Sequence, residues 1–505
     1  MAQSRMDRSI VDDAAMAGAI ERWAVDLPPG EEPARFLAAL EGGAVPDAAV
    51  PARAASAPPP ADLEARPVVA RLDEMLERIA RLNPSLHAFI TVDDEGARRR
   101  AGQLDAVPRR RRGPLHGLPI AVKDLCHVPG LPTTCGTKIP HYFTAAAECT
   151  VVTRLVAAGA INLGKLNMVE LALGAFGDNE NYGHVDNPWK SGHSAGGSSS
   201  GSAAAVSAGL VFGAVGSDTG GSIRLPAACC GIVGLKPTYG RVSRAGAMPL
   251  SWSLDHLGPM TRTVRDAALL LGIMAGHDPR DPTSSHRPVP DYLAGIESGI
   301  AGLRIGRPEN HYVEGLDRDV EIALDRALAE LARLGATVTR LRVPDPQPIT
   351  DATTIIGRAE SLVLHGAILR DRPDDLQPFT RERLAMGGSI PAYDYLQACR
   401  LRARLTREFL REVFAEVDLL VVPTTPEPAP SLIAALAGGP GEILQRSMRF
   451  ARFTRPFNGL GLPVLALPCG FSREDLPLSM SIVGRPFDET TVLRAGYAYQ
   501  QATQW

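Results

Sequence analysis

Several features that mark common protein classes are missing from this chain. Its seven cysteines are scattered, and no two of them form a CxxC pair. Its eleven histidines show neither HExxH nor HxH spacing. An odd, scattered set of cysteines is typical of a reducing compartment and not of a disulfide framework. Since the histidine spacing gives no support to a structural or catalytic metal either, we expect no disulfide framework and no metal.

Charge and hydropathy exclude further classes. The 505 residues carry a formal net charge of -3, which gives no reason to expect nucleic acid or an anionic membrane as a partner. The most apolar run, 203–216, is too short to span a bilayer. The first residues lack the apolar core of a signal peptide. We therefore expect a soluble, cytoplasmic protein that binds neither membrane nor nucleic acid directly.

The order of patterns along the chain predicts a short appendage and one main domain. Residues 1–62 contain two short helical patterns, at about 9–25 and 31–41, followed by a linker rich in proline and alanine at 51–60. Residues 63–505 form the predicted main domain, in which helices alternate with short apolar strands. This alternation favours an α/β fold with a mixed sheet.

Regular leucine spacing and glycine stops give the clearest individual elements. A helix is predicted at 65–82. Three further helices are each followed by a strand, at 150–159 and 160–164, 324–334 and 336–341, and 401–416 and 418–422. Helix, stop and buried strand in this order are typical of layered α/β proteins.

A glycine-rich loop at 216–226 carries the strongest chemical signal. It contains Asp218-Thr219-Gly220-Gly221-Ser222-Ile-Arg224. Glycines allow successive backbone N–H groups to turn toward one point, and such a nest can bind the oxyanion of a tetrahedral intermediate. Asp218 and Arg224 have opposite charges and are expected to pair. A GGS loop alone is more often a turn than an active site, so this loop by itself does not establish an oxyanion-binding site.

A serine-rich loop, Gly196-Gly-Ser198-Ser199-Ser-Gly-Ser202, precedes an alanine-rich helical pattern. Small hydroxyl residues in front of a helix can be mere N-caps. One or two serines would suffice for capping. Four serines with three glycines favour a close-packed polar site where a hydroxyl relays a proton.

Lys123 follows the apolar segment 118–122, which is predicted to be a buried strand. Burial would lower the pKa of its ammonium group, and a neutral lysine can act as a general base near pH 7. The alternative is a lysine at a strand end beside Asp124 whose ammonium group reaches solvent. Taken alone, the segment favours this alternative.

These segments together resemble the amidase signature family of serine hydrolases. Residues 117–124 match its lysine motif, and 196–202 and 216–226 match its serine- and glycine-rich signature. The spacings of 75 residues from Lys123 to Ser198 and 24 from Ser198 to Ser222 also fit. The likeness extends over roughly residues 65 to 500, and three motifs in order at matching spacing make it specific.

The resemblance implies a Ser-Ser-Lys triad. Ser222 would be the nucleophile that becomes acylated, Ser198 would relay the proton, and Lys123 would be the base. The peptide bond that precedes Ser198 would be cis, as it is in the family. The implied oxyanion hole consists of the backbone amides of Thr219, Gly220, Gly221 and Ser222. The implied supporting residues are Ser199, Asp218 and Arg224. Ser200 and Ser481 depart from residues common in the family, but neither removes a catalytic group.

The resemblance also implies a mixed sheet covered by helices on both faces and hydrolysis of a small-molecule amide without a cofactor. Anilides, esters or carbamates would be accepted if the pocket allows. A homodimer is expected only by analogy. We expect the substrate to be selected by Ala172 and by the segments 127–143, 355–395 and 450–457. Tyr393 and Tyr395 are candidates to line the pocket, or they pack on their own helix.

Three rival interpretations fit parts of the sequence. Ser194 lies in a GxSxG pattern, but no apolar strand leads into it as the hydrolase elbow requires. Lys165 ends a near P-loop in which Leu166 replaces the required hydroxyl residue. The serious rival lies within the family, where some members are the glutaminase subunit of a tRNA-dependent amidotransferase. The loop 174–183 resembles that subgroup, whereas the N-terminal extension favours a stand-alone amidase.

Overall fold

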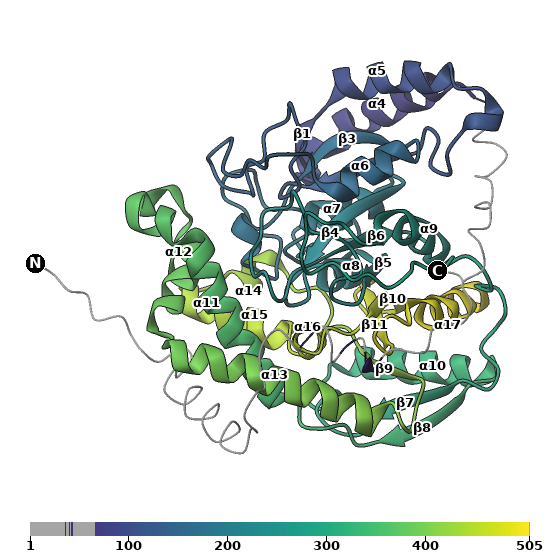
Figure 1. Cartoon of the computed structure of the whole chain (residues 1–505), viewed down its shortest axis with the longest axis vertical. Helices are drawn as coiled ribbons and strands as arrows, with labels where there is room; N and C mark the ends of the chain where they lie inside the picture. Colours follow the sequence, from purple (N-terminus) through teal and green to yellow (C-terminus); the bar gives the residue numbers. More distant parts are fainter. Residues whose placement is uncertain (1–35, 37–39, 41, 44–65, 504–505) are drawn as a thin grey trace, which may run out of the picture.

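One mixed sheet runs through the molecule (Figure 1). Over the described residues it has eleven strands in the order β1-β3-β2-β4-β6-β5-β10-β11-β9-β7-β8. In chain order they are β1 (Phe89–Val92), β2 (Pro119–Lys123), β3 (Ile161–Leu166), β4 (Gly213–Asp218), β5 (Val233–Lys236), β6 (His256–Thr261), β7 (Arg304–Pro308), β8 (Thr337–Leu341), β9 (Leu419–Pro423), β10 (Val464–Phe471) and β11 (Pro477–Val483). Strand β2 is parallel to both of its neighbours, β3 and β4, whereas β4 and β6 are antiparallel.

The computed structural model describes residues 66–503 together with Phe36, Leu40, Gly42 and Gly43. Its α-helices are α4 (Val68–Leu86), α5 (Asp94–Asp105), α6 (Thr150–Ala157), α7 (Ser200–Ser207), α8 (Arg224–Cys230), α9 (Val264–Met274), α10 (Arg318–Arg333), α11 (Gln347–Asp371), α12 (Pro378–Ala385), α13 (Ala392–Val413), α14 (Leu432–Ala435), α15 (Pro440–Phe450), α16 (Arg455–Gly459) and α17 (Glu489–Ala502). The predicted helix at 9–25 and the linker at 51–60 lie outside the described residues, as does most of 31–41. The domain boundary at residue 62 stays a prediction.

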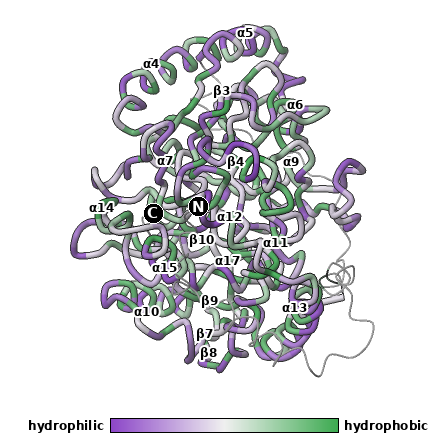
Figure 2. Tube along the Cα trace, turned by 90° about the vertical axis from the view of Figure 1, so that its left-hand side faces the viewer, coloured by the Kyte–Doolittle hydropathy of each residue, from purple (hydrophilic) through white to green (hydrophobic). Residues whose placement is uncertain are grey.

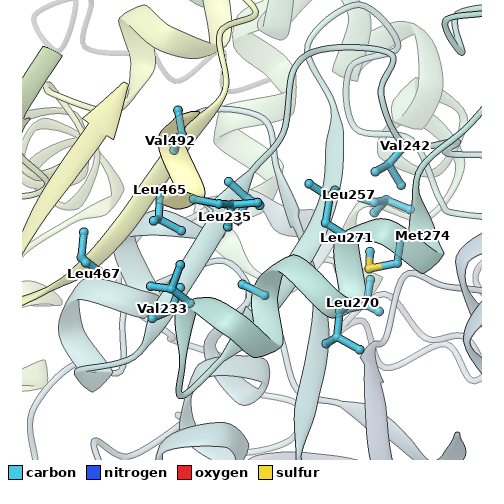
Figure 3. Close-up of a cluster of buried hydrophobic side chains, with 14 of the residues drawn as sticks. Val233, Leu235, Val242, Leu257, Leu270, Leu271, Met274, Leu465, Leu467 and Val492 are labelled. Atoms are coloured by element: carbon cyan, nitrogen blue, oxygen red, sulfur yellow. The ribbon is translucent and has the colours of Figure 1, made fainter. Parts of the chain in front are cut away.

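Helices cover both faces of the sheet. Successive side chains of a strand point to opposite faces. In β2, Ile120 and Val122 belong to a core cluster that includes residues of α9 and α17, whereas Ala121 belongs to a second cluster that includes α4 and α7. Figure 3 shows part of the first cluster, where side chains of β5, β6 and β10 meet those of α9 and α17. The predicted α/β fold, a mixed sheet between two helical layers, is confirmed.

The two ends of the molecule differ in what they contain. Helices α4 and α5 lie at one end, beside β3, and β7 and β8 lie at the opposite end (Figures 1 and 2). The predicted helix at 65–82 is α4, and the three predicted helix–strand pairs are α6 with β3, α10 with β8, and α13 with β9. Helix α13 begins at Ala392, nine residues before the apolar stripe at 401–416.

All seven cysteines are buried and unpaired. None of the helices over residues 66–503 combines the length and the apolar composition that a membrane crossing requires. No three His, Cys, Asp or Glu side chains converge as metal ligands in the described part of the chain.

Candidate active site

Lys123 is the last residue of β2, and its side chain is completely buried. Its Nζ donates to Ser198 Oγ at 2.6 Å and to Ser217 Oγ at 2.9 Å. Burial lowers the pKa of Lys123 from 10.5 to about 7, although the charge of Asp218 acts in the opposite direction. The neighbouring Asp124 pairs with Lys165 at 2.8 Å. The alternative of an ammonium group that reaches solvent beside Asp124 is therefore wrong.

The topology explains why Lys123 meets the two serine-containing loops. Strands β2 and β4 are parallel neighbours, so their carboxyl ends, at Lys123 and Asp218, lie at the same edge of the sheet. The peptide bond between Gly197 and Ser198 is cis. Ser199 N donates to Ser222 O at 3.2 Å, which joins the first loop to the second.

Ser199 connects the loops a second time through its side chain. Its Oγ donates to the Ser217 carbonyl at 3.1 Å and accepts from the Ser217 amide at 3.2 Å. Ser199 stands at the N-cap of α7, but its hydroxyl makes no capping hydrogen bond there. The capping alternative for this serine is therefore wrong, and the hydroxyl instead holds the end of β4.

A buried ion pair organises the loop that carries Ser222. The Asp218 carboxylate accepts from Gly221 N at 2.7 Å, from Ile223 N at 3.1 Å and from two nitrogens of Arg224 at 3.0 Å. Burial alone would raise the pKa of Asp218, but the charge and hydrogen bonds of Arg224 hold it well below its usual range. Asn458 Nδ2 adds a further donor at 2.8 Å. Asp218 and Arg224 pair as predicted, whereas nothing in the local sequence indicated Asn458.

The predicted oxyanion residues divide into two groups. The Gly221 amide is occupied by Asp218. Over the described residues, nothing accepts from the amides of Thr219, Gly220 and Ser222, while the Thr219 side chain donates to Asp255 at 2.6 Å. Gly221 has φ +133, and a Cβ there would collide with Thr454 Oγ1, so the turn requires glycine.

Ser222 lines a cavity at the centre of this arrangement. The described residues of its lining include Ala172, Gly174, Thr219 and Gly220. Tyr393 is 56% exposed, and Tyr395 OH donates to Glu360 at 2.9 Å; neither lines the cavity. The structure thus places Ala172 at the cavity and both tyrosines away from it.

Three arginines that the sequence did not single out line the same cavity. They are Arg358 on α11, Arg383 on α12 and Arg455 on α16. All three fall within the segments 355–395 and 450–457, which were predicted to select the substrate. The sequence gives little indication that these individual arginines line a cavity, because isolated arginines in helical sequence usually face solvent.

Ser194 of the GxSxG pattern and Lys165 of the near P-loop both have structural roles. Ser194 is buried, and its Oγ donates to Phe176 O at 2.7 Å and accepts from Gly196 N at 3.0 Å. Lys165 forms the buried pair with Asp124. Both side chains are therefore accounted for by contacts within the fold.

The Asp218–Arg224 pair leads to a stability prediction. We expect Asp218→Asn to lower the free energy of unfolding by about 3–5 kcal/mol, because it leaves the buried Arg224 charge without a counter-charge. Chemical denaturation measures the change. Asp371→Asn removes an exposed partner of Arg370 and should leave the unfolding midpoint unchanged. Equal midpoints for wild type and Asp218→Asn would contradict this account of the loop.

Comparison with known proteins assigns the family. The family model described as Amidase matches residues 70–493. A glutamyl-tRNA(Gln) amidotransferase subunit of Chloroflexus aggregans is 42% identical over 458 residues, covering 85% of this chain and 92% of the relative.

Solved structures agree with the sequence comparison. One, described as an unexpected vestigial protein complex that reveals the evolutionary origins of an s-triazine catabolic enzyme, has a TM-score of 0.80 and 35% identity, covering 87% of this chain and 96% of its own. A crystal structure of an amidase has a TM-score of 0.76 and 37% identity, covering 87% and 97%. This chain therefore belongs to the amidase signature family, and it is an enzyme that acts on amide C–N bonds.

Proposed function

We propose that this chain hydrolyses a carboxylic amide to an acid and an amine through an acyl-enzyme on Ser222. The observation that carries the proposal is the 2.6 Å contact from Lys123 Nζ to Ser198 Oγ, made by a buried lysine whose pKa is about 7. A lysine with that pKa is partly neutral at neutral pH, so it can accept a proton as a general base.

In the proposed acylation, Ser222 Oγ attacks the amide carbonyl carbon and a C–O bond forms. The Ser222 proton passes to Ser198, whose own proton passes to Lys123. The amides of Gly220 and Ser222 stabilise the oxyanion, and each such donor contributes about 3 kcal/mol. The C–N bond then breaks as Lys123 returns a proton through Ser198 to the leaving nitrogen.

In the proposed deacylation, water takes the place that the amine has left. Lys123 accepts a proton from the water through Ser198, and the resulting hydroxide attacks the ester carbonyl of the acyl-enzyme. The ester C–O bond breaks, the acid leaves and Ser222 recovers its proton. The same base therefore serves both halves of the reaction, with no change of residue.

The pKa of Lys123 predicts the pH dependence. Below about pH 7 the lysine is protonated and cannot act as the base, whereas above it the lysine is neutral. We expect kcat/KM to rise about tenfold per pH unit below pH 7 and to level off above it. Initial rates with an uncharged amide between pH 5 and 9 measure this. A flat profile through pH 7 would contradict the assignment of Lys123 as the base.

A second candidate is the glutaminase subunit of a tRNA-dependent amidotransferase. The 42% identical relative carries the name of such a protein, and this observation favours the amidotransferase component over the stand-alone amidase that the N-terminal extension had favoured. In that case the chain would release ammonia from glutamine and would work with partner chains.

The purified chain, assayed alone, separates the two candidates. A fluorophosphonate probe followed by peptide mapping shows whether Ser222 is an activated nucleophile. Anilide, carbamate and simple amide substrates are then compared with glutamine, with ammonia and the acid measured separately. Turnover without other proteins supports the stand-alone amidase. Labelling of Ser222 without turnover of any of them supports an enzyme that needs its partner chains, and the absence of both contradicts the proposed function.

A further inference from the structure

The cavity that Ser222 lines is positively charged. Three arginines line it, whereas no aspartate or glutamate is among the described lining residues. Arg383 and Arg455 form no ion pair with a described residue. Arg455 Nε is also buried without a hydrogen-bond partner. A cation that is partly buried without a counter-charge is costly unless a ligand supplies one.

Arg455 lies directly beside the oxyanion nest. The Arg455 Cγ and Cζ atoms lie 3.7 and 3.8 Å from the position that a Cβ on Gly220 would occupy. Gly220 and Ser222 both line the same cavity as Arg455. A group bound to the guanidinium would therefore be close to an acyl group on Ser222.

Hydrogen bonds hold the short helix α16 against the loop of the nucleophile. Thr454 Oγ1 donates to Gly220 O at 2.8 Å, and Arg224 donates to Thr454 O at 2.9 Å. Within α16, Asn458 accepts from Arg224 at 2.6 Å and donates to Asp218 at 2.8 Å. Arg455 lies between these two anchor residues in sequence, so the fold fixes the position of its backbone beside the loop of Ser222.

The charges of the three cavity arginines affect one another's pKa values. Burial, together with the charges of Arg455 and Arg358, lowers the pKa of Arg383 to about 9, and burial with the charge of Arg358 lowers that of Arg455 to about 10. Both therefore stay cationic at neutral pH. The carboxylate that acts on Arg383 is Asp178, which lies outside the described lining of the cavity.

Two carboxylates near the cavity accept hydrogen bonds from residues of the surrounding fold. Glu360 accepts hydrogen bonds from Ser253 and Tyr395, and Asp255 accepts from Thr219 and the Leu250 amide. Neither carboxylate is among the described lining residues. Asp178 acts on Arg383 from behind the lining residue Gly174. The described lining residues therefore offer positive charge to a ligand and include no carboxylate for an ammonium group.

We propose that the substrate is an anionic amide whose acyl part carries a carboxylate, held by Arg455 and Arg383, and carries no ammonium group beside it. The proposal rests on the proposed amide hydrolysis and names its substrate class. Charge-assisted pairing of a guanidinium with a carboxylate orients the acyl group as well as binding it. Glutamine has the carboxylate but also an ammonium group, which this cavity would leave without a partner.

The test compares small primary amides with and without a carboxylate and an ammonium group. The half-amides of succinate, glutarate and adipate carry one carboxylate, the half-amide of glutarate is glutamine without its ammonium group, and butyramide is uncharged. We expect the best half-amide to exceed butyramide in kcat/KM by about 100-fold and glutamine by about 10-fold. A preference for butyramide or for glutamine would overturn the inference.

Variants then assign the preference to Arg455. In Arg455→Gln, the ratio of kcat/KM for the best half-amide to that for butyramide should fall by about 10- to 100-fold, and Arg455→Lys should recover part of it. Arg449→Gln is the matched control, because Arg449 pairs with Glu427 at the surface. An unchanged ratio in Arg455→Gln would overturn the inference.

A binding measurement separates failure of this inference from failure of the proposed function. Calorimetry on Ser222→Ala measures the affinity for the glutarate half-amide without turnover, and Arg455→Gln in the same background should weaken it by about tenfold or more. If no amide is hydrolysed and Ser222 is not labelled, the proposed function fails, and calorimetry still decides whether the cavity binds carboxylates. Equal affinity with and without Arg455 would contradict the anion site.

Discussion

Ser222→Ala is expected to lower kcat/KM for any amide substrate by about 10⁴-fold or more, with the fold intact. The nucleophile is the one group that no other residue replaces, and removing it from a serine hydrolase leaves only the contribution of binding and oxyanion stabilisation. The structure gives Ser222 Oγ no hydrogen bond to a described residue. Its removal therefore strands no polar partner, and the free energy of unfolding should change by less than about 0.5 kcal/mol.

The matched control is Ser194→Ala, the serine of the GxSxG pattern. Its Oγ is hydrogen-bonded to Phe176 and to Gly196, so its loss should cost about 1 kcal/mol of stability and leave turnover unchanged. Activity assays, denaturation curves and the mass of the fluorophosphonate adduct are measured on both variants. Residual amide turnover above a tenth of wild type in Ser222→Ala would exclude it as the nucleophile.

The fold was predictable where local patterns are strong. The helix–glycine–strand order predicted α6 with β3 and α10 with β8, because leucines at helical spacing and a glycine stop are read within a short window. The first turns of α13 carry a weaker pattern, because Tyr393 and Leu396 are exposed and do not continue the buried apolar stripe that follows. The order of the strands in the sheet depends on pairings distant in sequence, and no local pattern encodes them.

The residues of the candidate site were also predictable only where a local motif marks them. Ser198 and Ser222 were singled out because they lie in contiguous motifs rich in glycine and serine, and Lys123 because it directly follows an apolar strand segment. The partners that complete the site come from elsewhere: Asn458 is 240 residues from Asp218 in sequence. The cavity arginines come from three separate helices, and in sequence each resembles an ordinary exposed arginine. Only the packing of α11, α12 and α16 around the loop of Ser222 brings their charges together.

The second large effect is expected from Lys123→Met, which should lower kcat/KM for amides by about 10³-fold or more. Methionine keeps the length of the side chain and removes the base. The effect should be smaller for nitrophenyl esters than for amides, because an amine must be protonated to leave and a nitrophenolate need not be. Rates for an amide and an ester with the same acyl group measure the difference. An equal loss for both would indicate that Lys123 acts only through the structure of the site.

Lys165, which like Lys123 and Lys236 is a buried lysine of this sheet, provides the control for that result. Lys165 pairs with Asp124, so Lys165→Met leaves a buried carboxylate without its counter-charge and should cost about 3–5 kcal/mol of stability. Lys123 forms no ion pair with a described residue and contacts two serine hydroxyls, so Lys123→Met should cost about 1–2 kcal/mol at most. Loss of activity with retained stability at Lys123, and loss of stability at Lys165, would separate the catalytic lysine from the structural one. If Lys123→Met unfolds as readily as Lys165→Met, its loss of activity is no evidence for a base.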